Sequence, residues 1–136
     1  MITSDITVNS GTWKVVRCGR RDNGAKVNYA VNAIINGGEF YGSFAAGSDH
    51  EAEGDLSLIV NGGTFYSGIY LLSMSAKPTA NAYGYTGDAR IELNGGTVTG
   101  EIVPSSQSTK DTYNPTINGS YTVIIGDADL SGVTSI

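Results

Sequence analysis

The chain is poor in the residues that most often carry chemistry. Its 136 residues include a single cysteine, Cys18, and a single histidine, His50. One cysteine excludes an internal disulfide framework and a cysteine-rich zinc site, and one histidine leaves little material for a histidine-based metal centre or triad. We interpret Cys18 as a small structural side chain, with a reactive thiol as the alternative.

Charge is also scarce, because only 15 % of the residues are charged and the formal net charge is −5. The one basic cluster consists of Lys14, Arg17, Arg20 and Arg21. Nucleic acids and anionic membranes are bound by larger groups of Lys and Arg, so the composition predicts neither as a partner. No apolar run approaches the roughly 20 residues of a transmembrane helix, and the first residues, MITSDITV, do not resemble a signal peptide.

Proline is rare, with three residues, whereas glycine is abundant, with nineteen. No window of about a dozen residues has a helical apolar stripe without glycine, proline or β-branched residues. This composition excludes long helices and predicts a turn-rich, all-β chain. The length suits one compact domain.

A short motif recurs along the chain, and its spacing predicts the architecture. The copies are VNSGTW from Val8, INGGEF from Ile35, VNGGTF from Val60, LNGGTV from Leu93 and a degraded INGSY from Ile117. Their asparagines are 27, 25, 33 and 24 residues apart, a period typical of solenoids. Before the motif, apolar and polar residues alternate, as in Ala89 to Leu93, which indicates half-buried strands.

Each unit contains a strand, a glycine bend, a short strand, a second glycine and a third strand. We therefore predict a single-stranded parallel β-helix of about four to five coils, with an antiparallel β-sandwich as the alternative. In-register stacking would form an internal ladder of asparagines. It would also stack the apolar residues that follow the motif, and the expected members of the two columns are Asn9, Asn36, Asn61, Asn94 and Asn118, and Trp13, Phe40, Phe65 and Val98.

Residues 6–103, with their recurring NGGxF and a following glycine, resemble the right-handed parallel β-helix of pectate-lyase-like and adhesin-like secreted bacterial proteins. The resemblance concerns the architecture and the style of the repeat. It implies an extracellular or cell-surface location.

The last residues, GDADLSGVTSI from Gly126 to Ile136, resemble the first calcium loop of a type I dockerin. The resemblance implies that Asp127, Asp129 and Ser131 are oxygen ligands of Ca²⁺. The sequence stops before the last ligand of such a loop, so calcium is expected only with the full loop. This divides the chain into a β-helix domain, residues 1–125, and a truncated dockerin-like loop or linker, residues 126–136. A downstream dockerin implies a cohesin as partner.

Charged residues and tyrosines in the insertions between repeats are candidate ligand sites. Asp49 and Glu51 lie in the densest ionisable cluster, GSDHEAEGD, where carboxylates could act in glycoside cleavage or bind Ca²⁺. A solvated acidic loop is the alternative. Arg20 and Arg21 could bind an acidic sugar through bidentate bonds or balance surface charge.

Tyrosines of the longest insertion, SAKPTANAYGYTG, are the candidates for sugar stacking. Tyr83 and Tyr85 lie in this segment, and packing of the insertion against the β-helix is the alternative interpretation of both.

These features favour a non-catalytic extracellular module that serves as a spacer, an adhesin or a carbohydrate-binding surface for a polysaccharide or cell-surface glycan. No catalytic residue is assigned, because no GxSxG, HExxH, P-loop or dinucleotide motif occurs. Two alternatives remain open: a fragment of a polysaccharide lyase or hydrolase, and a solenoid that associates end to end through its uncapped strand edges.

Overall fold

The computed structural model describes residues 2–18, 29–46, 51–72, 84–105 and 116–136. These residues form sixteen strands and no helix, so no helix in this part of the chain is able to cross a membrane. Every strand pair is parallel, which confirms the β-helix and excludes the antiparallel sandwich.

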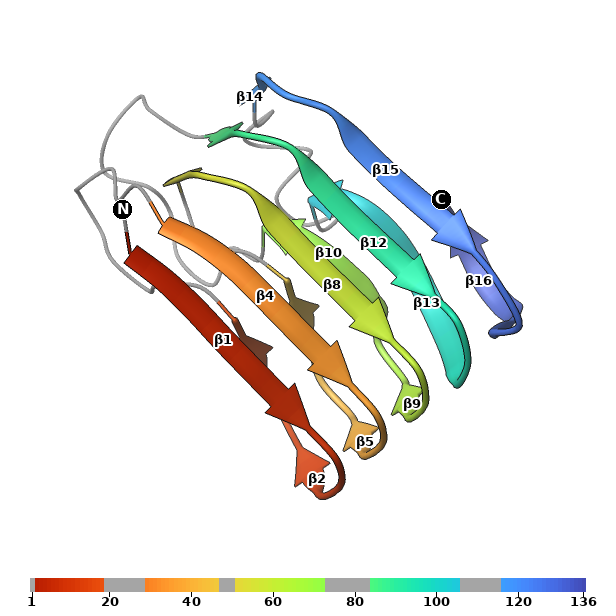
Figure 1. Cartoon of the computed structure of the whole chain (residues 1–136). Helices are drawn as coiled ribbons and strands as arrows, with labels where there is room; N and C mark the ends of the chain where they lie inside the picture. Colours follow the sequence, from red (N-terminus) through yellow and green to blue (C-terminus); the bar gives the residue numbers. More distant parts are fainter. Residues whose placement is uncertain (1, 19–28, 47–50, 73–83, 106–115) are drawn as a thin grey trace.

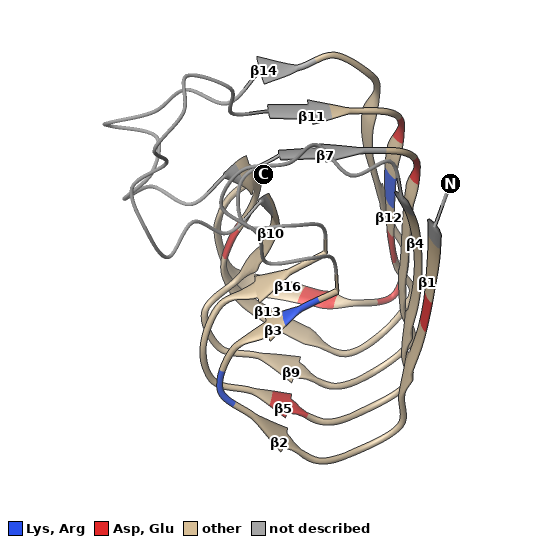
Figure 2. Cartoon of the chain, turned by 90° about the vertical axis from the view of Figure 1, so that its left-hand side faces the viewer, with Lys and Arg blue, Asp and Glu red and all other residues tan. Residues whose placement is uncertain are grey.

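Two large sheets and one small sheet surround the core (Figures 1 and 2). The first sheet contains β1 (Ile2–Val8), β4 (Tyr29–Ile35), β8 (Leu56–Val60), β12 (Ala89–Leu93) and β15 (Tyr121–Ile125). The second contains β2 (Thr12–Trp13), β5 (Glu39–Phe40), β9 (Thr64–Phe65), β13 (Thr97–Ser105), β10 (Ile69–Leu72), β6 (Phe44–Ala45) and β3 (Val16–Arg17), and β16 (Asp129–Ser135) pairs with β13. The third contains β7 (Glu51–Glu53), β11 (Gly84–Thr86) and β14 (Thr116–Ile117).

Successive strands alternate between the sheets, so the chain winds as a parallel β-solenoid with one strand of the first sheet in each of five coils. The first coil holds β1, β2 and β3, and the fifth holds β15 and β16. The predicted β-helix of about four to five coils is therefore confirmed.

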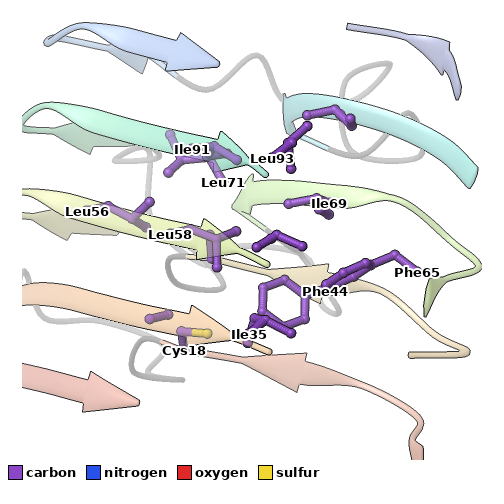
Figure 3. Close-up of a cluster of buried hydrophobic side chains, with 14 of the residues drawn as sticks. Cys18, Ile35, Phe44, Leu56, Leu58, Phe65, Ile69, Leu71, Ile91 and Leu93 are labelled. Atoms are coloured by element: carbon purple, nitrogen blue, oxygen red, sulfur yellow. The ribbon is translucent and has the colours of Figure 1, made fainter. Parts of the chain in front are cut away.

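The core consists of columns of apolar side chains, each contributed by equivalent positions of successive coils (Figure 3). The alternation read from the sequence predicts the columns of the first sheet correctly, and all are buried: Val31, Leu56 and Ala89; Ala33, Leu58 and Ile91; Ile35, Val60 and Leu93. Burial of each Val, Leu or Ile side chain among them contributes roughly 1.5–3 kcal/mol relative to exposure.

The second sheet adds an aromatic column to the core. The rings of Phe40 and Phe65 are stacked, with centroids 4.6 Å apart, and Phe44 packs edge-on against both. Val98 continues the column and is buried, whereas Trp13 begins it in the first coil and is 41 % exposed. The predicted apolar stack is confirmed, and its end at Trp13 is open to solvent.

The bends between β8 and β9 and at the equivalent corners require glycine for two different reasons. A Cβ on Gly62 would lie 2.5 Å from the carbonyl oxygen of Asn36 in the preceding coil. Gly63 has a φ of 96°, a conformation that other residues rarely adopt. In the first coil Ser10 takes the place of the first glycine, and the described structure has no coil on the side that its Cβ faces.

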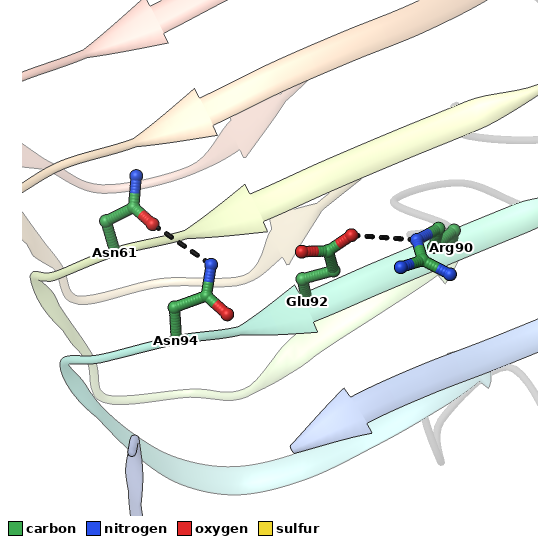
Figure 4. Close-up of polar contacts among 4 residues, drawn as sticks. All are labelled: Asn61, Arg90, Glu92 and Asn94. Carbon is green, nitrogen blue, oxygen red and sulfur yellow. Dashed lines mark hydrogen bonds and ion pairs between the residues drawn. The ribbon is translucent and has the colours of Figure 1, made fainter. Parts of the chain in front are cut away.

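The asparagine ladder exists between four coils. Asn36 Nδ2 donates to Asn9 Oδ1 at 2.9 Å, and Asn61 donates to Asn36 at 2.9 Å. Asn94 donates to Asn61 at 3.2 Å, and Figure 4 shows this last bond. The prediction of an internal ladder is wrong, since all four residues are exposed. Each asparagine follows an inward apolar residue, so strand alternation turns its side chain outward.

Asn118 does not belong to this ladder, which corrects the prediction of a fifth member. Leu93 pairs with Ile125, and Gly126 N donates to Leu93 O at 2.9 Å, so Gly126 takes the place next to Asn94. Asn118 instead precedes β15, at a different corner of the fifth coil.

We expect Gly62→Ala to lower the free energy of unfolding by about 1–3 kcal/mol, because the new methyl group would overpack against the Asn36 carbonyl. The entropic gain from replacing glycine is smaller, about 0.4–1 kcal/mol, so the clash decides the sign. Urea unfolding monitored by circular dichroism measures the change. Ser10→Ala is the matched control and should change stability by less than about 0.5 kcal/mol. Equal losses in both variants would contradict the close approach of the coils.

Candidate functional site

A pair of exposed tyrosines lies on the outer side of the second sheet. Tyr41 follows β5 and Tyr66 follows β9, and their rings stack with centroids 4.6 Å apart and an angle of 7° between the planes. The two residues are 49 % and 43 % exposed. Trp13, in the first coil, is the other large aromatic side chain found exposed among the residues whose exposure the structure describes.

One carboxylate holds both tyrosine hydroxyls. Tyr41 Oη donates to Glu39 Oε2 and Tyr66 Oη donates to Glu39 Oε1, each at 3.3 Å. The negative charge of Glu39 raises the pKa of Tyr41 above its usual value, because it disfavours a second anion nearby. Thr64, on the neighbouring strand, pairs with Glu39 in register and adds a hydroxyl to this face.

The geometry limits what this tyrosine pair can bind. The facing sides of the two rings are occupied by each other, so they are not available to stack on a sugar. A ligand would meet the ring edges, the outer ring faces and the Glu39 carboxylate. Such a surface suits hydrogen bonding to hydroxyl groups more than it suits flat stacking.

A second polar column runs along the corner that precedes the strands of the first sheet. Asp88 N donates to Asp55 Oδ1 at 3.0 Å, and Ser120 donates to Asp88 Oδ1 through both its backbone N and its hydroxyl, each at 2.9 Å. The Ser120 donors lower the pKa of Asp88. An ionised carboxylate held by donors from the next coil is a structural element and not a general acid.

Sequence reasoning missed this column and counted Asp55 with the acidic loop. The signal was present, because Asp55, Asp88 and Ser120 each follow a glycine and are about one solenoid period apart. A Cβ on Gly87 would meet the Gly54 carbonyl, and one on Gly119 would meet the Gly87 carbonyl. The preceding glycine is therefore required for the same reason as in the asparagine corner.

Most of the predicted ligand residues lie outside the described part of the chain, namely Arg20, Arg21, Asp49 and Tyr83. Glu51 lies in β7 and Tyr85 in β11, which are neighbouring strands of the third sheet. Glu51 pairs with Gly84, and Tyr85 pairs with Ala52, so the two residues are not opposite each other. Ligand binding by these six residues stays a prediction.

The segment that resembles a dockerin loop forms the last corner and strand of the solenoid. Asp127 lies in the bend after β15, and Asp129 and Ser131 lie in β16, which pairs with β13. Ser131 N donates to Asp129 Oδ1 at 3.0 Å and lowers the pKa of Asp129. Within the described residues no three His, Cys, Asp or Glu side chains could hold a metal ion together, and calcium binding stays a prediction.

The charges of the described strands are spread over several coils (Figure 2). An ion pair joins Arg90 Nε to Glu92 Oε1 at 2.8 Å on the outer side of β12 (Figure 4). The Arg90 side chain is more than half exposed, so this pair contributes about 0–1 kcal/mol.

Two titratable groups, the buried Cys18 and the partly buried Tyr121, pack among apolar side chains of the core. Cys18 is buried among apolar side chains (Figure 3), which raises the pKa of its thiol to about 12. The interpretation of Cys18 as structural is confirmed, because a reactive cysteine needs an accessible thiolate. Burial also raises the pKa of Tyr121 to about 12, and its hydroxyl has no hydrogen-bond partner among the described residues.

We expect stability to fall in alkaline solution because of Cys18 and Tyr121. Both groups bind protons more tightly in the folded state, so their contribution is complete below the ordinary pKa values of 9.0 and 10.0 and is lost as pH rises toward about 12. Urea unfolding measured across this range should show a decline that is smaller in Cys18→Ala and in Tyr121→Phe. Tyr121→Phe should also raise stability at neutral pH by about 1 kcal/mol, since it removes an unpaired buried hydroxyl. Tyr70→Phe is the control at neutral pH only, because Tyr70 Oη donates to Ser67 O at 3.0 Å and its loss should destabilise, whereas burial raises the pKa of Tyr70 too. Identical alkaline declines in all variants would contradict this assignment.

No protein-family model, no curated protein and no solved structure matches the chain. The assignment to parallel β-solenoids therefore depends on the order and register of the strands.

Proposed function

We propose that the chain is a non-catalytic structural module, a rigid solenoid segment that acts as a spacer within a larger extracellular bacterial protein. The observation that carries this proposal is that the repeated polar residues bond to their own counterparts in the next coil. The asparagine ladder and the Asp55, Asp88 and Ser120 column both do so. The repeat thus encodes contacts between coils.

The two ends of the solenoid support a role in a longer assembly. Large apolar side chains are exposed in the first coil, at Trp13 and Val15 (50 %), and in the last, at Ile125 (55 %). Ile125 belongs to the core column of Leu93, so the last coil leaves the core open. We infer that further coils, from the same protein or from a second copy, stack on such ends.

The extracellular location follows from the resemblance of the NGGxF repeat to secreted pectate-lyase-like and adhesin-like β-helices. The resemblance of the last residues to a dockerin loop supports attachment to a cohesin, with Ca²⁺ bound by Asp127, Asp129 and Ser131 in the complete loop.

Glycan binding is the second candidate function, and the tyrosine pair favours it. Tyr41 and Tyr66 are exposed on the outer side of the second sheet, and Glu39, which accepts from both hydroxyls, offers a carboxylate to sugar hydroxyls. Aromatic rings combined with hydrogen-bonding groups are typical of surfaces that bind carbohydrates.

The spacer proposal predicts that one coil can be removed without loss of the fold. Deleting Asn36–Val60 joins Ile35 to Asn61, and because Ile35 and Val60 are register partners, every column is preserved. We expect cooperative unfolding at lower stability and a solenoid shorter by about 4.8 Å, measured by urea unfolding and small-angle X-ray scattering. Deleting Asn36–Ile59, one residue fewer, is the matched control and should disturb the alternation of the strand. Failure of the in-register deletion to fold would contradict the proposal.

Glycan binding predicts depletion of the protein onto polysaccharides without release of reducing or unsaturated ends. A panel of plant and mucin polysaccharides tests both signals. We expect Tyr66→Ala to weaken depletion by about five- to thirtyfold, since about 1–2 kcal/mol of contact and positioning is lost. Ile34→Ala, an exposed apolar residue of the first sheet, is the control and should bind normally. Absence of depletion would rule out glycan binding and leave the spacer role as the remaining proposal. Release of reducing or unsaturated ends would contradict a non-catalytic module.

A further inference from the structure

Four of the five asparagines of the motif are followed directly by glycine, a pair with its own chemistry. The backbone nitrogen of the glycine can attack the side-chain carbonyl carbon of the asparagine and close a five-membered ring. Glycine permits this because it has no side chain to hinder the bend. The reaction needs an asparagine amide that is free to turn and a glycine nitrogen that is free to lose its proton.

The ladder asparagines have their side-chain amides held by hydrogen bonds, and at Asn61 and Asn94 the following glycine nitrogen is held as well. The Asn61 amide donates to Asn36 and accepts from Asn94, so both of its polar atoms are held. The next backbone nitrogen is held as well, because Gly62 N donates to Ile35 O at 3.3 Å. Gly95 N donates to Val60 O at 3.2 Å in the same way.

Asn118 differs from the ladder asparagines in its side-chain amide, and from Asn61 and Asn94 also in the nitrogen of the following glycine. It lies at another corner, and both it and Gly119 are exposed. Neither the Asn118 amide nor Gly119 N makes a hydrogen bond to any residue that the structure describes. The register explains this difference. Gly54 N, in the same column as Gly119, donates to Thr86 O of the next coil at 2.9 Å. Since β14 and β15 are the last strands of their sheets, the described structure has no further coil to which Gly119 N can donate.

We propose that Asn118–Gly119 is a site of spontaneous deamidation, and that the same dipeptide is protected wherever it lies in the ladder. Gly119 N loses its proton to hydroxide and bonds to Asn118 Cγ. The Cγ–Nδ2 bond breaks, and the nitrogen leaves as ammonia after taking a proton from water. Water then opens the cyclic imide at either carbonyl, which yields aspartate or isoaspartate at position 118.

The product would loosen the last coil. Ser120 lies two residues further on and donates two hydrogen bonds to Asp88. A new carboxylate at position 118 adds negative charge near Asp88, and isoaspartate adds a backbone atom ahead of Ser120. Both changes disturb the contact that positions β15 against β12. Deamidation would thus weaken the contact between β15 and β12 progressively as the protein ages.

Peptide mapping by mass spectrometry tests the proposal on the intact chain in mildly alkaline buffer. Each of the four Asn-Gly pairs of the motif is followed in the same sample, and isoaspartate is detected with an isoaspartyl methyltransferase. The chain has a fifth pair, Asn23–Gly24, which lies outside the described residues and is mapped separately. We expect Asn118 to convert at least about tenfold faster than Asn36, Asn61 and Asn94, because each protected site must first break hydrogen bonds of about 1 kcal/mol each. In denaturant the four rates should converge.

Asn118→Gln is the control variant, since its longer side chain closes a six-membered ring much more slowly. It should remove the fast phase and leave the other three sites unchanged. Equal native rates at all four sites, or a native rate at Asn118 below the others, would overturn the proposal. Convergence of the rates in denaturant shows that the fold, and not the local sequence, sets the difference.

Discussion

In-register hydrogen bonding between coils continues through the corners of the solenoid, and the rest of the structure depends on it. Asn61 N donates to Ile35 O at 2.8 Å just before the bend, and Thr64 N donates to Gly38 O at 2.9 Å just after it. The backbones of adjacent coils therefore stay at hydrogen-bonding distance where the chain changes direction. A Cβ at Gly62 has no room there, so the glycine columns follow directly from backbone pairing.

The same constraint decides what the side chains do. Equivalent positions lie one strand spacing apart, about 4.8 Å, so each residue has its own counterpart as its nearest neighbour. Phenylalanines stack inside, tyrosines stack outside, and asparagine amides join head to tail. The exposed ladder contributes modestly, since a hydrogen bond that competes with water adds about 0.5–1.5 kcal/mol. The buried columns provide most of the stability.

The fold was predictable from the sequence because in-register pairing of successive coils requires the same residue types to recur at each coil. Alternation identified the inward columns of Ile35, Val60 and Leu93 correctly. The error at Asn118 arose because the NGG motif was used to align the fifth coil, whereas the apolar residues of β15 set its register. In the fifth coil the apolar pattern of β15 aligns with β12, and this places Gly126 next to Asn94. The Asp55 and Asp88 column was missed because its glycines lie in irregular insertions, which hide the period. Stacking of Tyr41 on Tyr66 was derivable, because they directly follow Phe40 and Phe65, which are register partners; the hydrogen bonds of both hydroxyls to Glu39 were not.

In-register stacking also explains why charge is sparse and scattered. Two like charges in one column would face each other at about 4.8 Å, where their repulsion is about 1 kcal/mol or more. Outward columns therefore separate charged residues by neutral ones, as in the column of Asp5, Asn32, Ser57, Arg90 and Thr122. Among the described residues, Asp55 and Asp88 are the one pair of like charges at equivalent positions of successive coils. There Asp88 N donates to the Asp55 carboxylate, and Ser120 donates twice to that of Asp88. Backbone donors from the next coil offset the repulsion, so this solenoid holds adjacent carboxylates only where the coil above supplies the hydrogen bonds.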